Sequence, residues 1–448
     1  MKLGKRETFS SIMALALPIV AEEILSTLLQ YVDTAMVGRL GAEATASVNL
    51  TSTVNWLLGS LMSSFGIAIV AMISSSYGRK DREGIKRQSA TGFLLSLALG
   101  LILFAICLSI SPFLPTWMNA DPAIRKRAGE YFFIISLALP FRSLSVMAAS
   151  SMRAIKDSKT PMVVNLSQNV VNIILNYILI YPMEMGVRGA AAATFVSYTL
   201  GSVVMAQAAY RKKELSFSRN ELKNQKPLIE EALSIALPAS ATNTTSCLGH
   251  ITFASLVSSM GTITFAAHSI ALSAETIFYV PGYGLRGATS TLIGISVGEG
   301  DRKKFKEIEH ISIAITVVMM TFTGLLLHIF AYPIMKIFTP DQRVVEMGAE
   351  VLKMIALSEP IFGLMIVSEG ICYGLGDTKF PFAVETFGAW GIRILLSVLG
   401  LKYLGISLFG VWICMLLDNM FRALALFIPL ISGRDRKLYE KRRKGLER

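Results

Sequence analysis

Long apolar runs recur from one end of the chain to the other, separated by short polar connections. A run of about 20 residues spans a bilayer as a helix, because lipid cannot satisfy the hydrogen bonds of an open strand edge. The pattern therefore predicts an all-α polytopic membrane protein with twelve transmembrane helices. We expect them at 10–37, 44–76, 89–111, 129–152, 161–182, 189–210, 232–258, 264–296, 309–333, 346–373, 381–403 and 406–432.

The chain matches itself at an offset of 220 residues. The tripeptide Ala16-Leu17-Pro18 matches Ala236-Leu237-Pro238, and a D-x-K-x-P motif that begins at Asp157 recurs at Asp377. So many matches in one register indicate two homologous halves. We therefore predict four parts: an N-terminal six-helix bundle at 1–210, a linker at 211–230, a C-terminal six-helix bundle at 231–433, and a basic tail at 434–448.

Six spans in each half give both bundles the same orientation in the membrane. They are then expected to be related by a pseudo-two-fold axis along the membrane normal. Two bundles that face each other in this way leave a cleft between them, and rocking of one bundle against the other opens it alternately to each side. The repeat alone thus favours a transporter.

The chain of 448 residues carries a net charge of +12, and its distribution argues for a membrane rather than a nucleic-acid partner. Most of the 43 lysines and arginines fall in the connections on one side of the predicted spans. This asymmetry predicts a multi-pass plasma membrane protein with both termini in the cytoplasm. The basic tail is expected to contact anionic headgroups.

Asp33 lies inside the first apolar run, where a carboxylate costs about 3 kcal/mol on insertion scales and by default marks a transport path. Glu22, Ser26, Gln30 and Asp33 are spaced by four, four and three residues, so they share one helical face. No basic residue stands within one turn of Asp33, and Gln30 is in reach to hydrogen-bond it. Asp33 is therefore predicted to be functional, the alternative being a structural aspartate. Glu22 belongs to this site or lines an aqueous vestibule.

The fifth predicted helix carries a second polar stripe, and the sixth adds a hydroxyl. Amides at membrane depth either hold helices together or line a hydrated cavity. Five amides on one face favour the lining, above all for Asn172 and Asn176. The residues concerned are Asn165, Gln168, Asn169, Asn172, Asn176 and Thr194.

In the second half, the segment Pro281–Gly287 (PGYGLRG) has the form of a dinucleotide-binding motif. That motif needs a preceding strand, whereas this segment interrupts an apolar run, so we expect a broken or kinked helix instead. Arg286 within it either contacts substrate in the cleft or pairs with a carboxylate. Asp418 and Arg422, four residues apart, are expected to form a structural ion pair.

The four cysteines and four histidines are dispersed and form no metal-ligand spacing. No catalytic triad or phosphate-binding loop is evident either. We therefore expect a monomeric protein that is not an enzyme and that binds no cofactor or metal.

Several motifs resemble those of the multidrug and toxic-compound extrusion (MATE) family, in its DinF-like branch. They are the ALP tripeptide in each half, VDTAMVGRLG at the end of the first helix, and the paired loops RAIKDSKTP and YGLGDTKFP. The resemblance covers essentially the whole chain. It implies a secondary active exporter of amphipathic, often cationic, organic compounds. It also implies that Asp33 is the essential carboxylate, with Asn172 and Thr194 near the drug site.

The coupling ion is the point at which this chain departs from its relatives. The NorM-like branch has cation-binding acidic side chains in its C-terminal half, at positions that are Ser246 and Phe362 here. Some DinF-like members have an aspartate where this chain has Asn176. Sodium favours several charged oxygen ligands. With Asp33 as the evident carboxylate, we expect proton antiport, with sodium coupling as the alternative. The partner of Asp33 at the 220-residue offset is Phe253, so coupling is expected in the N-terminal bundle alone.

A further alternative is a flippase for lipid-linked precursors, which belongs to the same superfamily. It would need a cationic cavity for pyrophosphate, with several arginines in the first-half spans. The predicted spans of that half contain only Arg142.

Overall fold

The computed structural model describes residues 2–447, and every regular element within them is a helix. The first half contains α1 (Lys2–Gly38), α2 (Ala42–Gly78), α3 (Arg82–Ile110), α4 (Leu114–Trp117), α5 (Pro122–Ser136), α6 (Leu139–Ala154), α7 (Lys159–Ile180) and α8 (Gly186–Arg211). The second half contains α9 (Lys226–Ser258), α10 (Thr262–Glu299), α11 (Arg302–Phe338), α12 (Gln342–Ala356), α13 (Glu359–Gly374), α14 (Lys379–Thr386), α15 (Leu395–Leu399), α16 (Leu408–Ile431) and α17 (Arg434–Glu447). Two π-helical turns, η1 (Phe387–Ile394) and η2 (Gly400–Leu404), continue α14 and α15.

The twelve predicted spans are confirmed. Within residues 2–447, nine helical segments are long and apolar enough to cross a membrane, and two bent pairs add two more spans. The remaining predicted span, 232–258, lies within α9, a helix of 33 residues. The bent pairs are α5 with α6, at 45°, and α12 with α13, at 55°. Both bends precede a proline in the first turn of the second helix, Pro140 or Pro360, which lacks the N–H that would continue the helix.

The chain packs into two compact units whose limits differ from the boundaries predicted from the repeat. The N-lobe is Ala21–Leu237, and the C-lobe is Met1–Val20 together with Pro238–Arg448. Helices α1 and α9 therefore each pass from one lobe to the other within three residues of the ALP prolines, Pro18 and Pro238. A proline inside a helix removes one hydrogen bond of the ladder and permits such a change of packing partner.

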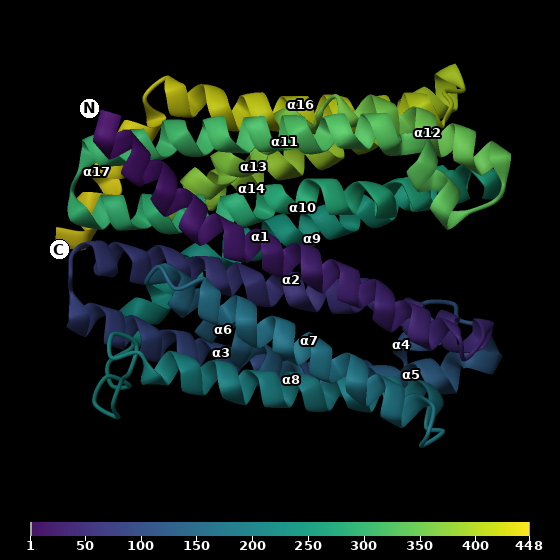
Figure 1. The fold of residues 1–448 in the computed structure, drawn as a ribbon, viewed down its shortest axis with the longest axis horizontal. Helices are drawn as coiled ribbons and strands as arrows, with labels where there is room; N and C mark the ends of the chain where they lie inside the picture. The colour runs from purple at the N-terminus through teal and green to yellow at the C-terminus, as the bar shows by residue number, and fades with distance from the viewer. Residues whose placement is uncertain (1, 448) are drawn as a thin grey trace. The chain divides into compact units, whose positions relative to one another are not determined.

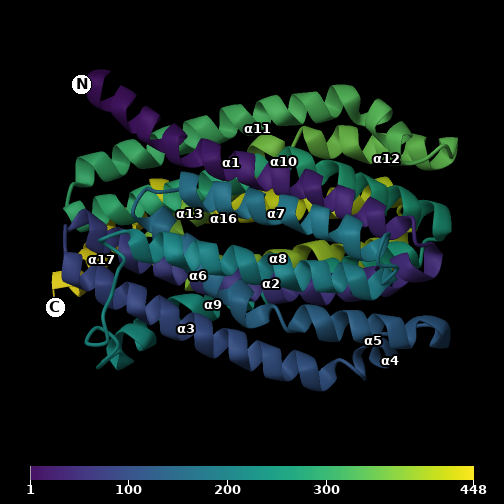
Figure 2. The ribbon, with the colours of Figure 1, turned by 60° about the horizontal axis from the view of Figure 1, so that its bottom comes forward.

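In the N-lobe, α6 packs against α2, α3 and α8, and α7 packs against α8 (Figure 2). Gly100 of α3 makes one of these contacts possible, since a Cβ atom there would lie 2.7 Å from the Cα of Pro140. The linker that follows α8 also belongs to this lobe. Leu215 is buried, and the side chains of Gln225 and Thr91 are hydrogen-bonded to each other.

In the C-lobe, α10, α11 and α13 pack side by side (Figure 1). A core that includes Trp412 of α16 is formed with residues of α9, α10, α11 and α12. We expected a broken or kinked helix in the eighth span, and of these two the break is wrong, because α10 is one continuous helix through Pro281. The glycines beside this proline serve close packing. A Cβ atom on Gly284 would lie 2.5 Å from Cγ2 of Val20, and one on Gly370 would lie 2.8 Å from the carbonyl oxygen of Arg286.

The matched D-x-K-x-P turns tie each lobe together in the same way. Asp157 forms an ion pair with Lys212 at 2.6 Å, and Asp377 forms one with Arg434 at 3.0 Å. In each lobe the partner follows the sixth span. Burial raises the pKa of Asp157, but hydrogen bonds from Lys212 and Thr160 outweigh it and bring the pKa below its usual value.

The segment predicted as a basic tail is the helix α17, which packs on the C-lobe. Asp435 and Tyr439 are buried in this helix. Lys306 of α11 pairs with Asp435 at 2.6 Å, and Tyr439 lies with its ring centroid 5.1 Å from that of Phe305. Charged residues thus hold this helix to the protein as well as giving it its basic character.

We predict that Lys212→Met lowers the free energy of unfolding by about 0.5–1 kcal/mol at neutral pH, as for a partly exposed ion pair. Because folding depresses the pKa of Asp157, this contribution is present above the unfolded value, about 3.9, and is lost as the pH falls through the lower folded value. Thermal denaturation in detergent between pH 3 and 8 measures it. Lys213→Met is the control, and an equal loss in that variant would contradict the prediction.

Candidate functional site

The polar faces of α1 and α7 meet in the N-lobe through a series of side-chain hydrogen bonds, which we call the polar seam. In each bond the α7 amide nitrogen donates to an α1 oxygen, and the two residues are 143 positions apart. A constant separation means that the two helices run parallel in one fixed register. The three pairs are Glu22 with Asn165, Ser26 with Asn169, and Asp33 with Asn176.

Asp33 stands at the end of a hydrogen-bond chain that crosses three helices. Asn176, which is fully buried, donates to Asp33 and also to Oδ1 of Asn172 at 3.2 Å. The Nδ2 of Asn172 in turn lies 3.4 Å from Oγ1 of Thr194 and 3.2 Å from Oγ of Ser197, both on α8. The side-chain amides of Asn176 and Asn172 therefore connect the carboxylate of Asp33 to α8.

The structure brings together most of the residues that the sequence singled out. Asp33, Asn172, Asn176 and Thr194 form the chain just described, and Asn165 and Asn169 belong to the polar seam. Gln30 does not join them: it is exposed, and its side chain forms no hydrogen bond with the residues that the structure describes. Arg286 lies in the C-lobe.

Glu22 is part of an ion pair that the sequence analysis missed. It is 5% exposed, and Nη2 of Arg153 lies 2.8 and 2.9 Å from its two carboxylate oxygens. Asn165 donates to the same carboxylate. Glu22 is therefore not a lining residue of an open vestibule. The only signal in the sequence was Arg153, one position beyond the predicted span 129–152.

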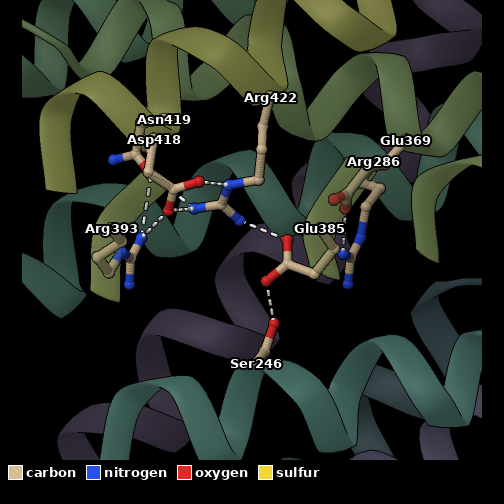
Figure 3. Close-up of polar contacts among 8 residues, drawn as sticks. All are labelled: Ser246, Arg286, Glu369, Glu385, Arg393, Asp418, Asn419 and Arg422. Atoms are coloured by element: carbon tan, nitrogen blue, oxygen red, sulfur yellow. Dashed lines mark hydrogen bonds and ion pairs between the residues drawn. The ribbon is translucent and has the colours of Figure 1, made fainter. Parts of the chain in front are cut away.

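The C-lobe contains an ionic network in place of the amides (Figure 3). Asp418 accepts from two arginines: Arg393 at 2.8 Å, and Arg422 at 2.8 and 2.9 Å. Asn419 accepts from the same two arginines. The predicted pair of Asp418 and Arg422 is thus present as one part of a larger network. Arg393 comes from the π-helical turn η1.

Two further carboxylates extend this network. Glu385 accepts from Arg422 and from the hydroxyl of Ser246. Arg286 forms an ion pair with Glu369 at 3.0 Å and lies over the ring of Tyr283, 4.6 Å from its centroid. Of the two alternatives for Arg286, the structure shows the pairing with a carboxylate. Each of the three arginines, Arg286, Arg393 and Arg422, is thus paired with a carboxylate.

Among the residues that the structure describes, no three or more His, Cys, Asp or Glu side chains are grouped so as to hold a metal ion. What the N-lobe offers instead is one carboxylate held by an amide. Such a group can take up and release a proton, and it can attract an organic cation.

A family model for MatE matches the chain twice, at residues 18–178 and 238–399. The chain belongs to the MatE family. Its members are membrane transporters rather than enzymes. The chain is 26% identical to a probable multidrug resistance protein NorM of Thermotoga maritima, with 96% of this chain and 94% of the relative covered. It is 25% identical to a probable multidrug resistance protein YoeA of Bacillus subtilis, with 92% and 91% covered.

The fold is that of solved MatE transporters. An outward-facing multidrug resistance MATE transporter of the MOP superfamily superimposes with a TM-score of 0.92 at 21% identity, with 96% of both chains covered. The two segments matched by the MatE model also confirm the internal repeat. Their first positions, 18 and 238, are 220 apart, and their last positions, 178 and 399, are 221 apart.

The second match is one residue longer than the first. A π-helical turn accommodates one residue more than the equivalent α-helix, and η1 lies between the two ends of the match. At a separation of 221, Asn172 corresponds to Arg393. Asn172 forms a hydrogen bond with Ser197 in the N-lobe, and Arg393 forms an ion pair with Asp418 in the C-lobe.

We predict that Arg153→Met destabilises this MatE protein by about 2–4 kcal/mol, because it leaves the carboxylate of Glu22 buried without a cation. The double variant Glu22→Gln/Arg153→Met should recover most of that loss, since both charges are gone. Thermal denaturation in detergent measures each variant. A double variant no more stable than Arg153→Met would show that the arginine acts through packing alone.

Proposed function

We propose that this MatE protein is a secondary active exporter of amphipathic, often cationic, organic compounds, driven by protons that enter through Asp33. It works as a monomer of the DinF-like type in the plasma membrane, with both termini cytoplasmic. Two full-length relatives with multidrug-resistance names support the substrate class. The observation that carries the proposal is the environment of Asp33, a carboxylate bonded to an amide and not to a cation.

An amide is a suitable partner for a carboxylate that changes its protonation state. Asn176 can donate through its NH₂ to ionised Asp33, or accept through its carbonyl from the protonated acid. The carbonyl oxygen Oδ1 of Asn176 is buried and has no hydrogen-bond partner among the described side chains. By rotating, this amide can therefore pair with Asp33 in both the ionised and the protonated state. Because the bond to Asp33 comes from an amide, protonation leaves no buried cation without its counter-charge.

Protonation of Asp33 would couple to the substrate through the chain of amides. Ionised Asp33 attracts an organic cation, and a proton arriving from outside removes that attraction and reorients Asn176. Because Asn176 also bonds Asn172, the reorientation changes the donors offered near Thr194. We assign the polar lining of the substrate path to these three residues and to Asn165, Asn169 and Gln30. We include Arg286 in this lining as an arginine whose charge is balanced by Glu369.

Sodium coupling is the alternative, and the same geometry weighs against it. A hard cation favours several charged oxygen ligands. The described contacts around Asp33 supply one carboxylate, and Asn176 turns its NH₂ toward it. The flippase alternative needs arginines free to bind pyrophosphate, whereas Arg286, Arg393 and Arg422 are each paired with a carboxylate.

We predict that Asp33→Asn abolishes proton-driven export, with a loss of at least tenfold, because the variant cannot take up the proton. Drug export from right-side-out vesicles is measured with either a pH gradient or a sodium gradient imposed. Glu184→Gln, an exposed acid, is the matched control and should transport normally. Unimpaired proton-driven export by Asp33→Asn would refute the mechanism.

We predict that Asn176→Asp makes export respond to sodium, because it places a second carboxylate beside Asp33 and completes a charged oxygen set for a hard cation. Export by the wild type and by the variant is compared in potassium and in sodium buffers at constant pH. Asn176→Ala is the control, since it removes the amide without adding charge. A variant whose export is equal in the two buffers would contradict this prediction.

A further inference from the structure

A large cavity lies in the C-lobe between the N-terminal parts of α1 and of α11. Its volume is about 1100 Å³, and among the described residues its lining comes from these two helices. Both segments belong to the same packed unit. The cavity is at the end of the lobe where α17 docks, since Lys306 at its edge pairs with Asp435.

The cavity changes from polar to apolar along both helices. On α1, Lys5 is followed by Phe9 and Met13 at intervals of four, which places the three on one helical face. On α11, Lys303 and Glu307 precede an apolar stretch that ends at Val318 and Met319. Phe9 and Val318 are 48% and 70% exposed. The polar end lies at the start of each helix, and the apolar part extends into the membrane-spanning portion.

The charges at the polar end are unevenly satisfied. Lys306 already pairs with Glu309 at 2.7 Å and with Asp435 at 2.6 Å. Within the described part of the chain, Lys5 and Lys303 form no ion pair. Oε1 of Glu307 is buried and has no hydrogen-bond partner among the described residues. The polar end thus presents two free cations beside an acceptor that lacks a donor.

We infer that this cavity binds a glycerophospholipid of the cytoplasmic leaflet whose headgroup carries a hydrogen-bond donor. The phosphate lies at Lys5 and Lys303, the headgroup ammonium or hydroxyl donates to Glu307, and the acyl chains occupy the apolar part along Phe9 and Val318. Basic pockets between membrane helices on the cytoplasmic side bind phospholipid headgroups in this way. Phosphatidylethanolamine and phosphatidylglycerol meet the requirement. Phosphatidylcholine, which has no donor, does not.

The match of this cavity to both the headgroup and the acyl chains of a phospholipid argues against other ligands. A soluble phosphate would leave the apolar part of the cavity unfilled and exposed to lipid. An amphipathic organic cation would match Glu307 but would meet the two lysines. The inference does not depend on the proposed transport function, because its test reads lipid binding alone.

The test is native mass spectrometry of the delipidated full-length protein with each of the three lipids at equal concentration. We expect phosphatidylethanolamine and phosphatidylglycerol to be retained at least tenfold more than phosphatidylcholine. Lys5→Gln/Lys303→Gln should reduce their retention at least tenfold. Glu307→Met should abolish the preference over phosphatidylcholine while leaving some binding.

The matched control is Lys437→Gln/Lys441→Gln, which removes the same charge from exposed positions of α17 at the same end of the lobe. An equal loss of lipid in this control would overturn the inference, because general attraction would then explain the binding. Equal retention of the three lipids, or displacement of bound lipid by millimolar inorganic phosphate or by tetraphenylphosphonium, would overturn it as well. Thermal denaturation verifies that each variant is folded.

Discussion

Every polar group at membrane depth has to find its partner inside the protein, and the interior of each lobe follows from this constraint. In the N-lobe the partners are chiefly amides, which bond the polar face of α1 in one register along α7. The register depends on matching spacings in the two helices. Because the polar residues of α1 at 22, 26 and 33 recur on α7 at 165, 169 and 176, one alignment satisfies all of them at once.

In the C-lobe, full charges stand in place of several of these amides. Counted at the 221-residue separation of the matched ends, Arg393 of η1 stands where the N-lobe has Asn172. Ser26 also has a counterpart in Ser246, but the latter contacts the carboxylate Glu385 and not an amide. In the C-lobe this carboxylate lies on the fifth span, in α14, and Arg422 donates to it. The two halves thus share their helices but differ in the polar side chains that join those helices.

Much of this was predictable from the sequence, because it depends on periodicity. The spans, the repeat, the polar stripes of α1 and α7 and the pair of Asp418 with Arg422 all follow from spacing along one helix. Contacts between distant segments were not predictable in the same way. The partner of Glu22 is Arg153, 131 residues away, and the sequence gives no register between α1 and α6. The expected break at Pro281 failed for a related reason, because a proline shows only that one helical hydrogen bond is lost locally. In the structure α10 continues through this proline, and Val20 lies close against Gly284 one turn further on.

The two ways of satisfying a buried carboxylate differ in what protonation would cost. When Asp418 takes up a proton, Arg393 and Arg422 lose the charge that balances them in a place without water, which is unfavourable by several kcal/mol. When Asp33 takes up a proton, Asn176 loses one charge-assisted hydrogen bond and can form a neutral one in its place. The first arrangement resists titration and the second permits it. This difference between the two carboxylates is the physical reason for proposing Asp33, rather than Asp418, as the group that takes up the coupling proton.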